Sequence, residues 1–199
     1  MIKIAIACST QGTLKTKTAL SIIETIRLNK SIDFLPIFRF GGYIAENKAK
    51  EVEVAQNCLC SHIFFVDHDM KFDPNVVTKL LSYDKYIIGA MYNYRYLPIE
   101  PMVKFLKEDG DWTAKIEEAK IDKIPNKIFE VGATGGGMLL VKMSVFDKLK
   151  KPYFKMEQDG EGNRVVTEDS GFYLQAQKLG IKVWCDPSLG IKHLGDLEF

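Results

Sequence analysis

The sequence predicts an α/β protein with a single domain over residues 1–199, and three observations favour this class. Strand-like and helix-like segments alternate through the first third of the chain. Residues 63–66 form an unbroken apolar run, typical of a strand buried on both faces of a parallel sheet. The later part mixes short strands with few helices, without repeats or linkers. We therefore expect an α/β half joined to a more antiparallel half.

The first half should contain four strands and three helices. Pro36 marks the second strand as an edge strand, because proline has no N–H to donate to a neighbour. Helical spacing of apolar residues supports the helices, with Ala19, Ile22, Ile23 and Ile26 on one face of the first and Val52, Ala55 and Leu59 on one face of the second. The expected strands are residues 2–8, 31–40, 63–66 and 85–91, and the expected helices are residues 14–28, 47–59 and a third after residue 73.

The second half should be more antiparallel. Asp109-Gly110-Asp111 is a hairpin signal between the strand-like residues 103–106 and 112–114. A glycine run at 135–137 leads into a strand over 138–141. A helix should begin at Thr167 and end at Gly180, which suits the position just past a helix end. A last strand should follow at 181–185.

Charge and cysteine content exclude several classes of protein. The formal net charge is +1, from 27 Lys and Arg against 26 Asp and Glu, so the chain lacks the basic excess of a nucleic-acid binder. No apolar stretch is long enough to span a bilayer, and the start of the chain shows no signal-peptide pattern, so we expect a cytoplasmic location. The four cysteines lack the two spaced pairs of a structural zinc site, and we expect free thiols.

The segment Asp67-His68-Asp69 carries the strongest chemical signal. It directly follows the buried run at 63–66, and ligands of open α/β sheets bind beyond the carboxyl ends of the strands. Carboxylates at the end of a buried strand are costly to desolvate without a partner. A hard divalent cation, Mn²⁺ or Mg²⁺, that holds a phosphorylated ligand would be a suitable partner. A simple turn or capped strand end is the alternative.

Four segments, in this order, resemble the family-two-like glycosyltransferases of the GT-A fold. They are Phe-Phe-Val-Asp-His-Asp-Met at 64–70, Gly-Gly-Gly-Met-Leu-Leu-Val at 135–141, Thr-Glu-Asp-Ser-Gly-Phe at 167–172 and Val-Trp-Cys-Asp-Pro-Ser-Leu-Gly-Ile-Lys-His at 183–193. The resemblance implies a minimal GT-A domain. Its Rossmann-like nucleotide-binding half, with a mostly parallel sheet, would end near residue 95, and a smaller mixed half with the acceptor and metal sites would follow from about 96.

The resemblance also implies a reaction, in which a sugar moves from a nucleoside-diphosphate sugar donor to an acceptor hydroxyl with inversion. Asp69 would ligate the metal ion, Asp67 would hold the donor ribose or a metal-bound water, and His193 would supply a late metal ligand. Asp169 would be the general base, and the start of a helix favours its ionised form.

The remaining expected contacts belong to the two substrates. The donor-binding residues would be Ser9, Thr10, Arg39, Asn47, His68, Arg95 and Gly136, and the acceptor-binding residues would be Glu168, Gly137, Trp184 and Tyr94. The chain departs from the family at the start of the second helix, where many relatives carry Arg-Asn and this sequence has Glu46-Asn47 with Lys48 beside them. The acceptor could be a glycan, a protein, a lipid or modified DNA, and a second subunit of a homo-oligomer could complete its site.

Other interpretations stay open. A nucleotidyltransferase shares the fold and the use of a metal, and a nucleotide-sugar binding module could have lost turnover. Phosphatases of the haloacid-dehalogenase type also have a strand ending in Asp-x-Asp, but on their first strand. At single positions, Glu168 and Asp169 could merely complement the helix dipole. His193 could belong to a surface tail, Trp184 to the core, Tyr94 and Arg95 to the surface, and the glycine run to a tight loop.

Overall fold

The computed structural model describes residues 1–106, 116–118, 120–158 and 164–195. The first half of the chain contains β1 (Ile2–Thr10), α1 (Thr16–Leu28), β2 (Ile32–Phe40), α2 (Ile44–Asn57), β3 (His62–Val66), β4 (Met70–Lys71), α3 (Val76–Ser82) and β5 (Ile87–Ala90). The second half contains β6 (Val103–Leu106), β7 (Ile116–Glu118), the 3₁₀-helix η2 (Ile121–Lys123), β8 (Phe129–Val131), β9 (Ala133–Thr134), β10 (Met138–Lys142), α4 (Met143–Phe146), β11 (Glu157–Gln158), β12 (Arg164–Val166), α5 (Glu168–Lys178), β13 (Val183–Asp186) and β14 (Lys192–His193).

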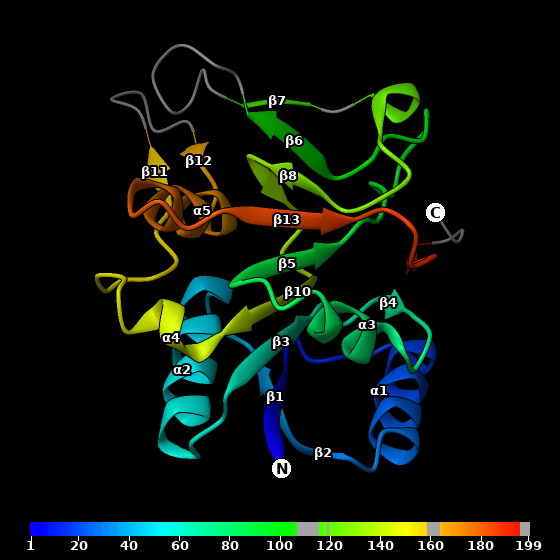
Figure 1. Cartoon of the computed structure of the whole chain (residues 1–199), viewed down its shortest axis with the longest axis vertical. Coiled ribbons are helices and arrows are strands. Elements are labelled where there is room, and N and C mark those ends of the chain that lie inside the picture. The colour runs from blue at the N-terminus through cyan, green and yellow to red at the C-terminus, as the bar shows by residue number, and fades with distance from the viewer. Residues whose placement is uncertain (107–115, 119, 159–163, 196–199) are drawn as a thin grey trace.

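A seven-stranded sheet with the order β2-β1-β3-β10-β5-β13-β8 runs through the molecule (Figure 1). The pairs β1–β2, β1–β3 and β13–β5 are parallel, while β10 is antiparallel to both β3 and β5, and β8 is antiparallel to β13. Strands β2, β1, β3, β5 and β13 therefore share one direction, and β10 and β8 run the other way. The predicted α/β class with a mostly parallel sheet is confirmed, and β2 is an edge strand, as Pro36 indicated.

Helices cover both faces of this sheet (Figure 1). One hydrophobic cluster joins buried residues of α2, α4 and α5 to one face, and a second joins residues of α1 and α3 to the other. The alternation along β3 shows the division, because Ile63 and Phe65 belong to the first cluster and Phe64 and Val66 to the second. An unbroken apolar strand is what a strand covered on both sides requires.

Helix α1 differs from the sequence prediction. Of the four residues on its predicted inner face, Ile22 is buried but Ile23 is 58% exposed. The helix instead buries hydroxyl groups, and two of them hold the segment after β3. Thr18 Oγ1 donates to the carbonyl of His68 at 3.0 Å, and the N–H of Phe72 donates to Ser21 Oγ at 3.1 Å. The polar side of α1 therefore fixes the turn that carries Asp67 and Asp69.

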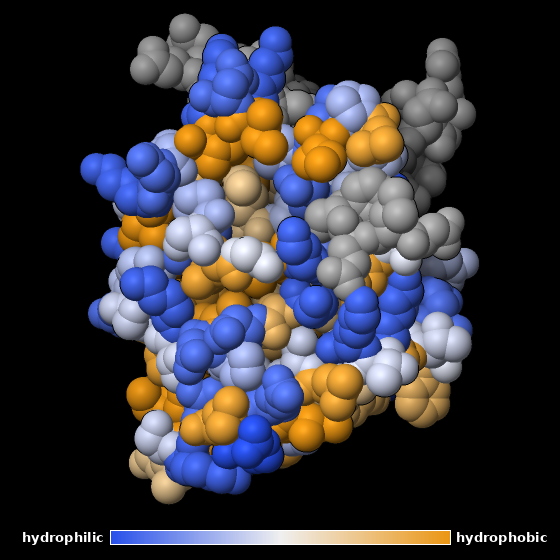
Figure 2. All heavy atoms as spheres, turned by 90° about the vertical axis from the view of Figure 1, so that its right-hand side faces the viewer, coloured by the Kyte–Doolittle hydropathy of each residue, from blue (hydrophilic) through white to orange (hydrophobic). Residues whose placement is uncertain are grey.

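The outer side of α1 is partly apolar, since Leu20 is 52% exposed. The side of the molecule on which α1 lies shows hydrophobic patches among hydrophilic groups (Figure 2). Among the described residues, none of the helices is both long enough and apolar enough to cross a membrane.

Shorter sheets complete the second half. Strand β6 pairs antiparallel with β7 and with β9, so the expected antiparallel insertion is present. Its predicted turn at 109–111 and the predicted strand at 112–114 lie outside the described residues. Strands β14 and β4 form a separate antiparallel pair. Because β10, β13 and β8 of the second half enter the main sheet, the two halves of the chain share one sheet.

Candidate functional site

The candidate site lies at the carboxyl edge of the main sheet. Asp67 directly follows β3, and residues 92–95 follow β5. Strand β10 runs the opposite way between these two strands, so its start, at Gly135, Gly136 and Gly137, lies at the same edge. Three segments that are far apart in the sequence therefore meet here, at the edge where ligands of open α/β sheets bind.

Asp69 and His193 lie next to each other because two short strands pair. His193 on β14 is opposite Met70 on β4, and the N–H of Leu194 donates to the main-chain oxygen of Asp69 at 2.8 Å. His193 Nε2 is 3.5 Å from Asp69 Oδ1, and Arg95 Nη1 is 2.6 Å from Asp69 Oδ2. Asp69 and His193 are both buried.

The orientation of the His193 ring favours a cation at this place. Its Nδ1 is 2.9 Å from the carbonyl oxygen of Asn93, which only accepts hydrogen bonds, so Nδ1 carries the proton. Nε2 then faces the Asp69 carboxylate either as a lone pair or, in a doubly protonated ring, as a donor. Two acceptors that face each other are stabilised by a cation or a hydrogen-bond donor between them. A backbone carbonyl on one ring nitrogen is also the usual second partner of a metal-ligating histidine.

Asp69 remains ionised in this environment. Burial by itself would raise the pKa of Asp69, but its hydrogen bond with His193 and the charges of His193, His68 and Arg95 outweigh the burial and hold the pKa below its usual value. The carboxylate is therefore in the form that binds cations.

Asp67 is the second carboxylate beside this pair. Its side chain makes no hydrogen bond within the part of the chain that the structure describes. A Cβ atom on Gly137 would lie 2.2 Å from Asp67 Oδ2, so only glycine leaves room for this carboxylate. Burial, despite the charge of Lys48, raises the pKa of Asp67, and a cation would remove that penalty.

These residues fit a hard divalent cation that is shared with a substrate. In the described residues, no three His, Cys, Asp or Glu side chains gather closely enough to hold a metal ion by themselves. Mg²⁺ bound with phosphates usually needs only one or two carboxylates, because phosphate oxygens and water fill its other positions. Asp69, with His193 or Asp67 beside it, meets that requirement.

Asp169 lies at the start of α5, whose N-cap Thr167 accepts a hydrogen bond from the N–H of Ser170 at 3.3 Å. Its Oδ1 is 2.5 Å from Lys48 Nζ on α2. A Cβ atom on Gly136 would be 2.2 Å from its Oδ2. Since Asp67 packs in the same way on the next glycine, the two carboxylates lie over neighbouring residues of one loop.

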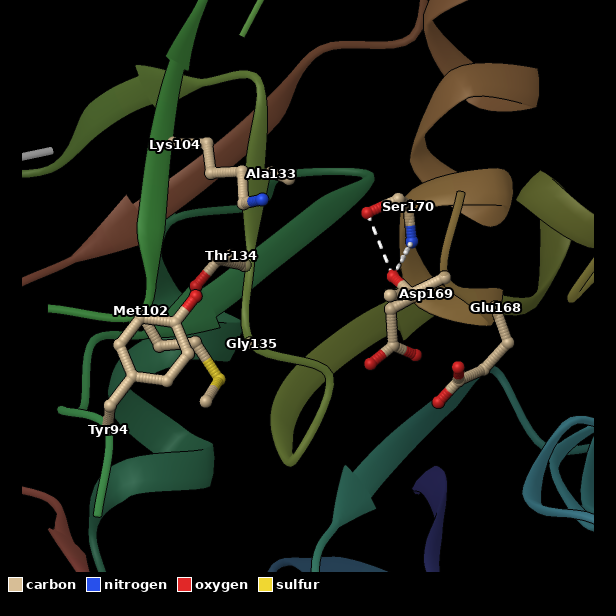
Figure 3. Close-up of a pocket in the computed structure, with 10 residues that line it drawn as sticks. Tyr94, Met102, Lys104, Ala133, Thr134, Gly135, Glu168, Asp169 and Ser170 are labelled. Atoms are coloured by element: carbon tan, nitrogen blue, oxygen red, sulfur yellow. Dashed lines mark hydrogen bonds between the residues drawn. The ribbon is translucent and has the colours of Figure 1, made fainter. Parts of the chain in front are cut away.

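A cavity of about 270 Å³ opens beside Asp169 (Figure 3). Glu168 and Asp169 extend from α5 on one side, and the ring of Tyr94 and the side chain of Met102 lie across from them. Its other lining residues are Lys104, Ala133, Thr134, Gly135, Thr167 and Ser170. A carboxylate, hydroxyl groups and an aromatic face are suitable contacts for a polyhydroxy compound. The expected acceptor residues Glu168 and Tyr94 therefore line one cavity with the expected base.

Ser9 and Arg39 lie side by side, because they are paired residues near the ends of β1 and β2. Ser9 Oγ donates to Glu51 Oε1 on α2 at 2.7 Å. Glu51 Oε2 and Arg39 Nε are buried without a hydrogen-bond partner. Burial raises the pKa of Glu51 to about 7, against the partial compensation by Ser9, Lys48 and Arg39. Buried unpaired groups of this kind are suited to contact a ligand such as a nucleotide base.

Other expected donor residues have structural contacts. Thr10 Oγ1 donates to the carbonyl oxygen of Thr13 within its own loop. Asn47 Nδ2 donates to the carbonyl of Gly41 at 2.6 Å and so closes the turn between β2 and α2. The His68 carbonyl accepts hydrogen bonds from α1 and from the main-chain N–H of Lys15. Their roles toward a donor stay predictions.

Trp184 is not brought to the other expected acceptor residues. It does not line the cavity beside Asp169. It lines a different cavity together with Lys85, whose Nζ lies 4.2 Å from the centre of the indole ring. The prediction for Trp184 came from the resemblance of the segment at 183–193, in which it precedes His193. On β13, its side chain packs against the cluster on the α1 side of the sheet, whereas α5 covers the opposite face.

Three residues at the site were not predicted. Lys48 and Glu51 are buried polar residues of α2 whose spacing would have placed them near one helix face. Tyr92 is buried, its hydroxyl accepts from the N–H of Gly137 at 3.1 Å, and its ring makes an edge contact with His193 at 5.2 Å between centroids. The available signal was its position directly after a buried strand.

No protein-family model matches this sequence, and no curated protein sequence matches it. Among solved structures, it is similar to the crystal structure of A197 from STIV, with a TM-score of 0.62 and 18% identity over 98% of this chain and 87% of that one. It also aligns with a protein described as a glucose-1-phosphate thymidylyltransferase from Bacillus anthracis, in complex with a sucrose, at a TM-score of 0.47 and 12% identity over 97% of this chain and 89% of that one.

A further structure is the inositol-1-phosphate CTP transferase from T. maritima, at a TM-score of 0.47 and 10% identity over 95% of this chain and 90% of that one. Two of these three proteins are named as nucleotidyltransferases, and none is named as a glycosyltransferase. At such identities the likeness concerns the fold alone. The chain is therefore a mixed α/β protein of Rossmann-like fold, with polar groups gathered at the carboxyl edge of its sheet.

Proposed function

We propose that this protein is a metal-dependent glycosyltransferase that moves a sugar from a nucleoside-diphosphate sugar to an acceptor hydroxyl, with inversion at the sugar carbon. The observation that carries the proposal is the 3.5 Å approach of His193 Nε2 to Asp69 Oδ1, with Nδ1 already bound to a carbonyl oxygen. This arrangement leaves a place for a cation at the sheet edge where a diphosphate would bind. The resemblance of four sequence segments in order supports the same function.

Asp69 and His193 would hold Mn²⁺ or Mg²⁺, with Asp67 beside them. When bound, such an ion stabilises the negative charge that develops on a diphosphate leaving group. Arg95 would exchange its contact with Asp69 for the diphosphate, which offers the same bidentate chemistry as a carboxylate. Ser9, Arg39 and Glu51 would contact the nucleoside.

Asp169 would take the proton of the acceptor hydroxyl while the acceptor oxygen bonds to the sugar carbon and the diphosphate leaves. Its carboxylate lies beside the cavity that Glu168 and Tyr94 line, so the acceptor would occupy that cavity. A positioned base contributes roughly a hundredfold to ten-thousandfold to such a step.

A nucleotidyltransferase is the second candidate, and the buried ammonium of Lys48 favours it. An ammonium group at this place would also stabilise negative charge on the oxygens of a phosphate under attack. Product analysis separates the candidates. Release of a nucleoside diphosphate supports sugar transfer, whereas release of pyrophosphate from a nucleoside triphosphate and a sugar phosphate supports nucleotidyl transfer.

The first test is a thermal-shift screen of nucleoside diphosphates and nucleotide sugars, with and without Mn²⁺. We expect one base to raise the melting temperature only when the metal is present, because a ligand of the folded state stabilises it by mass action. The best donor is then incubated with glycan, lipid, protein and modified-DNA acceptors. Binding without nucleoside diphosphate release on any acceptor would indicate a binding module without turnover.

A further inference from the structure

The geometry points to Lys48 as a positioning residue that orients Asp169 as the base. This inference rests on the proposed function, and it adds a residue that the resemblance does not supply. The sequence departs from the related family at this place, where Glu46-Asn47-Lys48 replaces the Arg-Asn of many relatives. The structure shows where the departure leads, because Lys48 reaches across from α2 to α5.

The contact between the two residues is close and enclosed. Lys48 Nζ lies 2.5 Å from Asp169 Oδ1, and only 5% of the Lys48 side chain is exposed. The ammonium also lies 5.8 Å from the centre of the Phe154 ring, which closes one side of its environment. A buried charged group is retained only with a strong partner.

Lys48 is surrounded by negative charge. Burial by itself would lower the pKa of Lys48, but the charges of Asp169, Asp67 and Glu168 and the hydrogen bond to Asp169 outweigh it and raise the pKa above its usual value. The ammonium therefore stays charged throughout the pH range in which an enzyme works.

Asp169 is held from two sides. Lys48 binds Oδ1, and the main chain at Gly136 passes close to Oδ2, where a Cβ atom would be only 2.2 Å away. The carboxylate therefore has one orientation, beside the cavity that would take the acceptor. Fixed orientation is what a general base needs, because it must be within hydrogen-bond reach of the proton that it removes.

Stability alone does not account for the pair. A buried ion pair typically contributes no more than apolar residues of the same volume, because both charges lose their hydration. The partners lie on helices from different halves of the chain, and both helices border the site. An ion pair that crosses the site and ends on the proposed base is better explained by its effect on that base.

The test compares Lys48→Met with Lys48→Arg, which retains the charge, and with Lys50→Met, which removes an exposed lysine from the same helix. We expect Lys48→Met to lower kcat on the order of tenfold to a hundredfold while the Kd for the donor with Mn²⁺ stays unchanged. Lys48→Arg should restore a substantial part of kcat, and Lys50→Met should match the wild type. Weaker donor binding in Lys48→Met at unchanged kcat would overturn the positioning role and indicate a direct phosphate contact.

The double variant Lys48→Met/Asp169→Asn shows whether Lys48 acts through Asp169. If it does, the double variant will be no slower than Asp169→Asn alone, because residues that act as a unit are not additive. If the fold-losses in kcat of the two single variants multiply in the double variant, the inference is overturned. The double variant also removes both buried charges, so it serves if Lys48→Met does not fold.

A measurement that does not depend on enzyme activity tests the ion pair separately from the proposed function. The wild type, Lys48→Met, Asp169→Asn and the double variant are each unfolded in urea. This double-mutant cycle tests whether the effects of the two substitutions on the free energy of unfolding are coupled. Coupled effects on stability would show that the ion pair forms in solution. If the wild type nevertheless transfers no sugar, the proposed function fails while the ion pair is still supported. Additive stability effects would overturn the pair itself.

Discussion

His193 is held near Asp69 by its own Nδ1, by the main chain of Leu194 and by the edge of the Tyr92 ring. None of these contacts involves the nitrogen that faces Asp69. The ring is therefore oriented before any ligand binds. The conformational entropy that is lost when the ring is ordered is lost during folding and not during ligand binding. At the scale of single residues, the site is preorganised around Asp69.

Removal of the Asp69 carboxylate tests this arrangement. We expect Asp69→Ala to weaken Mn²⁺-dependent binding of the nucleoside diphosphate at least about tenfold, while binding without metal changes little. Asp33→Ala, which removes an exposed carboxylate of β2, is the control and should bind as the wild type does. Isothermal titration with and without Mn²⁺ measures both, and equal losses in the two conditions would contradict the metal role.

Glu51 predicts a pH effect on stability. Its pKa is about 7 in the folded protein against 4.5 as the ordinary value, because burial disfavours the ionised form. Between these two values the unfolded chain releases the proton and the folded protein retains it, so rising pH favours unfolding. The contribution present below pH 4.5 is therefore lost as pH rises toward 7, on the order of 3 kcal/mol.

Urea unfolding at about pH 5 and about pH 8 measures this effect. Relative to the wild type, Glu51→Gln should gain stability at the higher pH, because the amide cannot ionise. An identical pH dependence in the two proteins would contradict the raised pKa.

Sequence patterns predicted the residues that follow strands but not Lys48 and Glu51 inside α2. Asp67 and Asp69 end an apolar strand, so their place at the sheet edge follows from chain order. Lys48 and Glu51 resemble surface residues of a helix, and their burial depends on Asp169 and Ser9, which are distant in sequence. When charged residues of a helix are buried by contacts with distant parts of the chain, the sequence around them shows no pattern that predicts their burial.

At the scale of elements, the apolar pattern predicted the buried face of α1 only in part, because side-chain hydroxyls of this helix pack against the rest of the protein. Helix α1 buries Thr18 and Ser21 because the turn after β3 needs donors and acceptors there, and Ile23 is exposed as a result. Helix α2 ends at Asn57, and Leu59 beyond it is 86% exposed with a φ of 56°. The first difference comes from tertiary contacts of α1, which override spacing. The second comes from the local turn that ends α2, in which the N–H of Leu59 donates to Gln56 and the N–H of Cys60 donates to Ala55.

The Ser21 contact gives a prediction for α1. Ser21→Ala leaves the buried N–H of Phe72 without an acceptor, so we expect a loss of about 1–3 kcal/mol in the free energy of unfolding. Leu20→Ala, on the exposed side of the same helix, should change it by no more than about 0.5 kcal/mol. Chemical denaturation measures both variants, and equal effects would show that the hydroxyl does not hold the turn.

At the scale of the whole molecule, the two halves of the chain are interleaved. Strand β5 pairs only with β10 and β13 in the described sheet, and both belong to the second half. The strand order could not be predicted, because short apolar runs do not specify their neighbours. The sequence predicted the longer strands and helices, but it did not predict the short strands β4 and β14 or the order of strands in the main sheet.

The interleaving predicts how a fragment behaves. A fragment of residues 1–101 contains β5 without either neighbour and β3 without β10, so we expect it to lack a cooperative unfolding transition. Circular dichroism during urea unfolding and the dispersion of its amide NMR spectrum measure this, with the whole chain as the control. A cooperative, well-dispersed fragment would show that the first half is an independent domain.

The pairing of β14 with β4 has a consequence during synthesis. A ribosome makes Asp69 well before His193, so a growing chain holds only one member of the pair until β14 has been synthesised. Chains that stop between β4 and β14 would therefore lack one of the two proposed cation ligands.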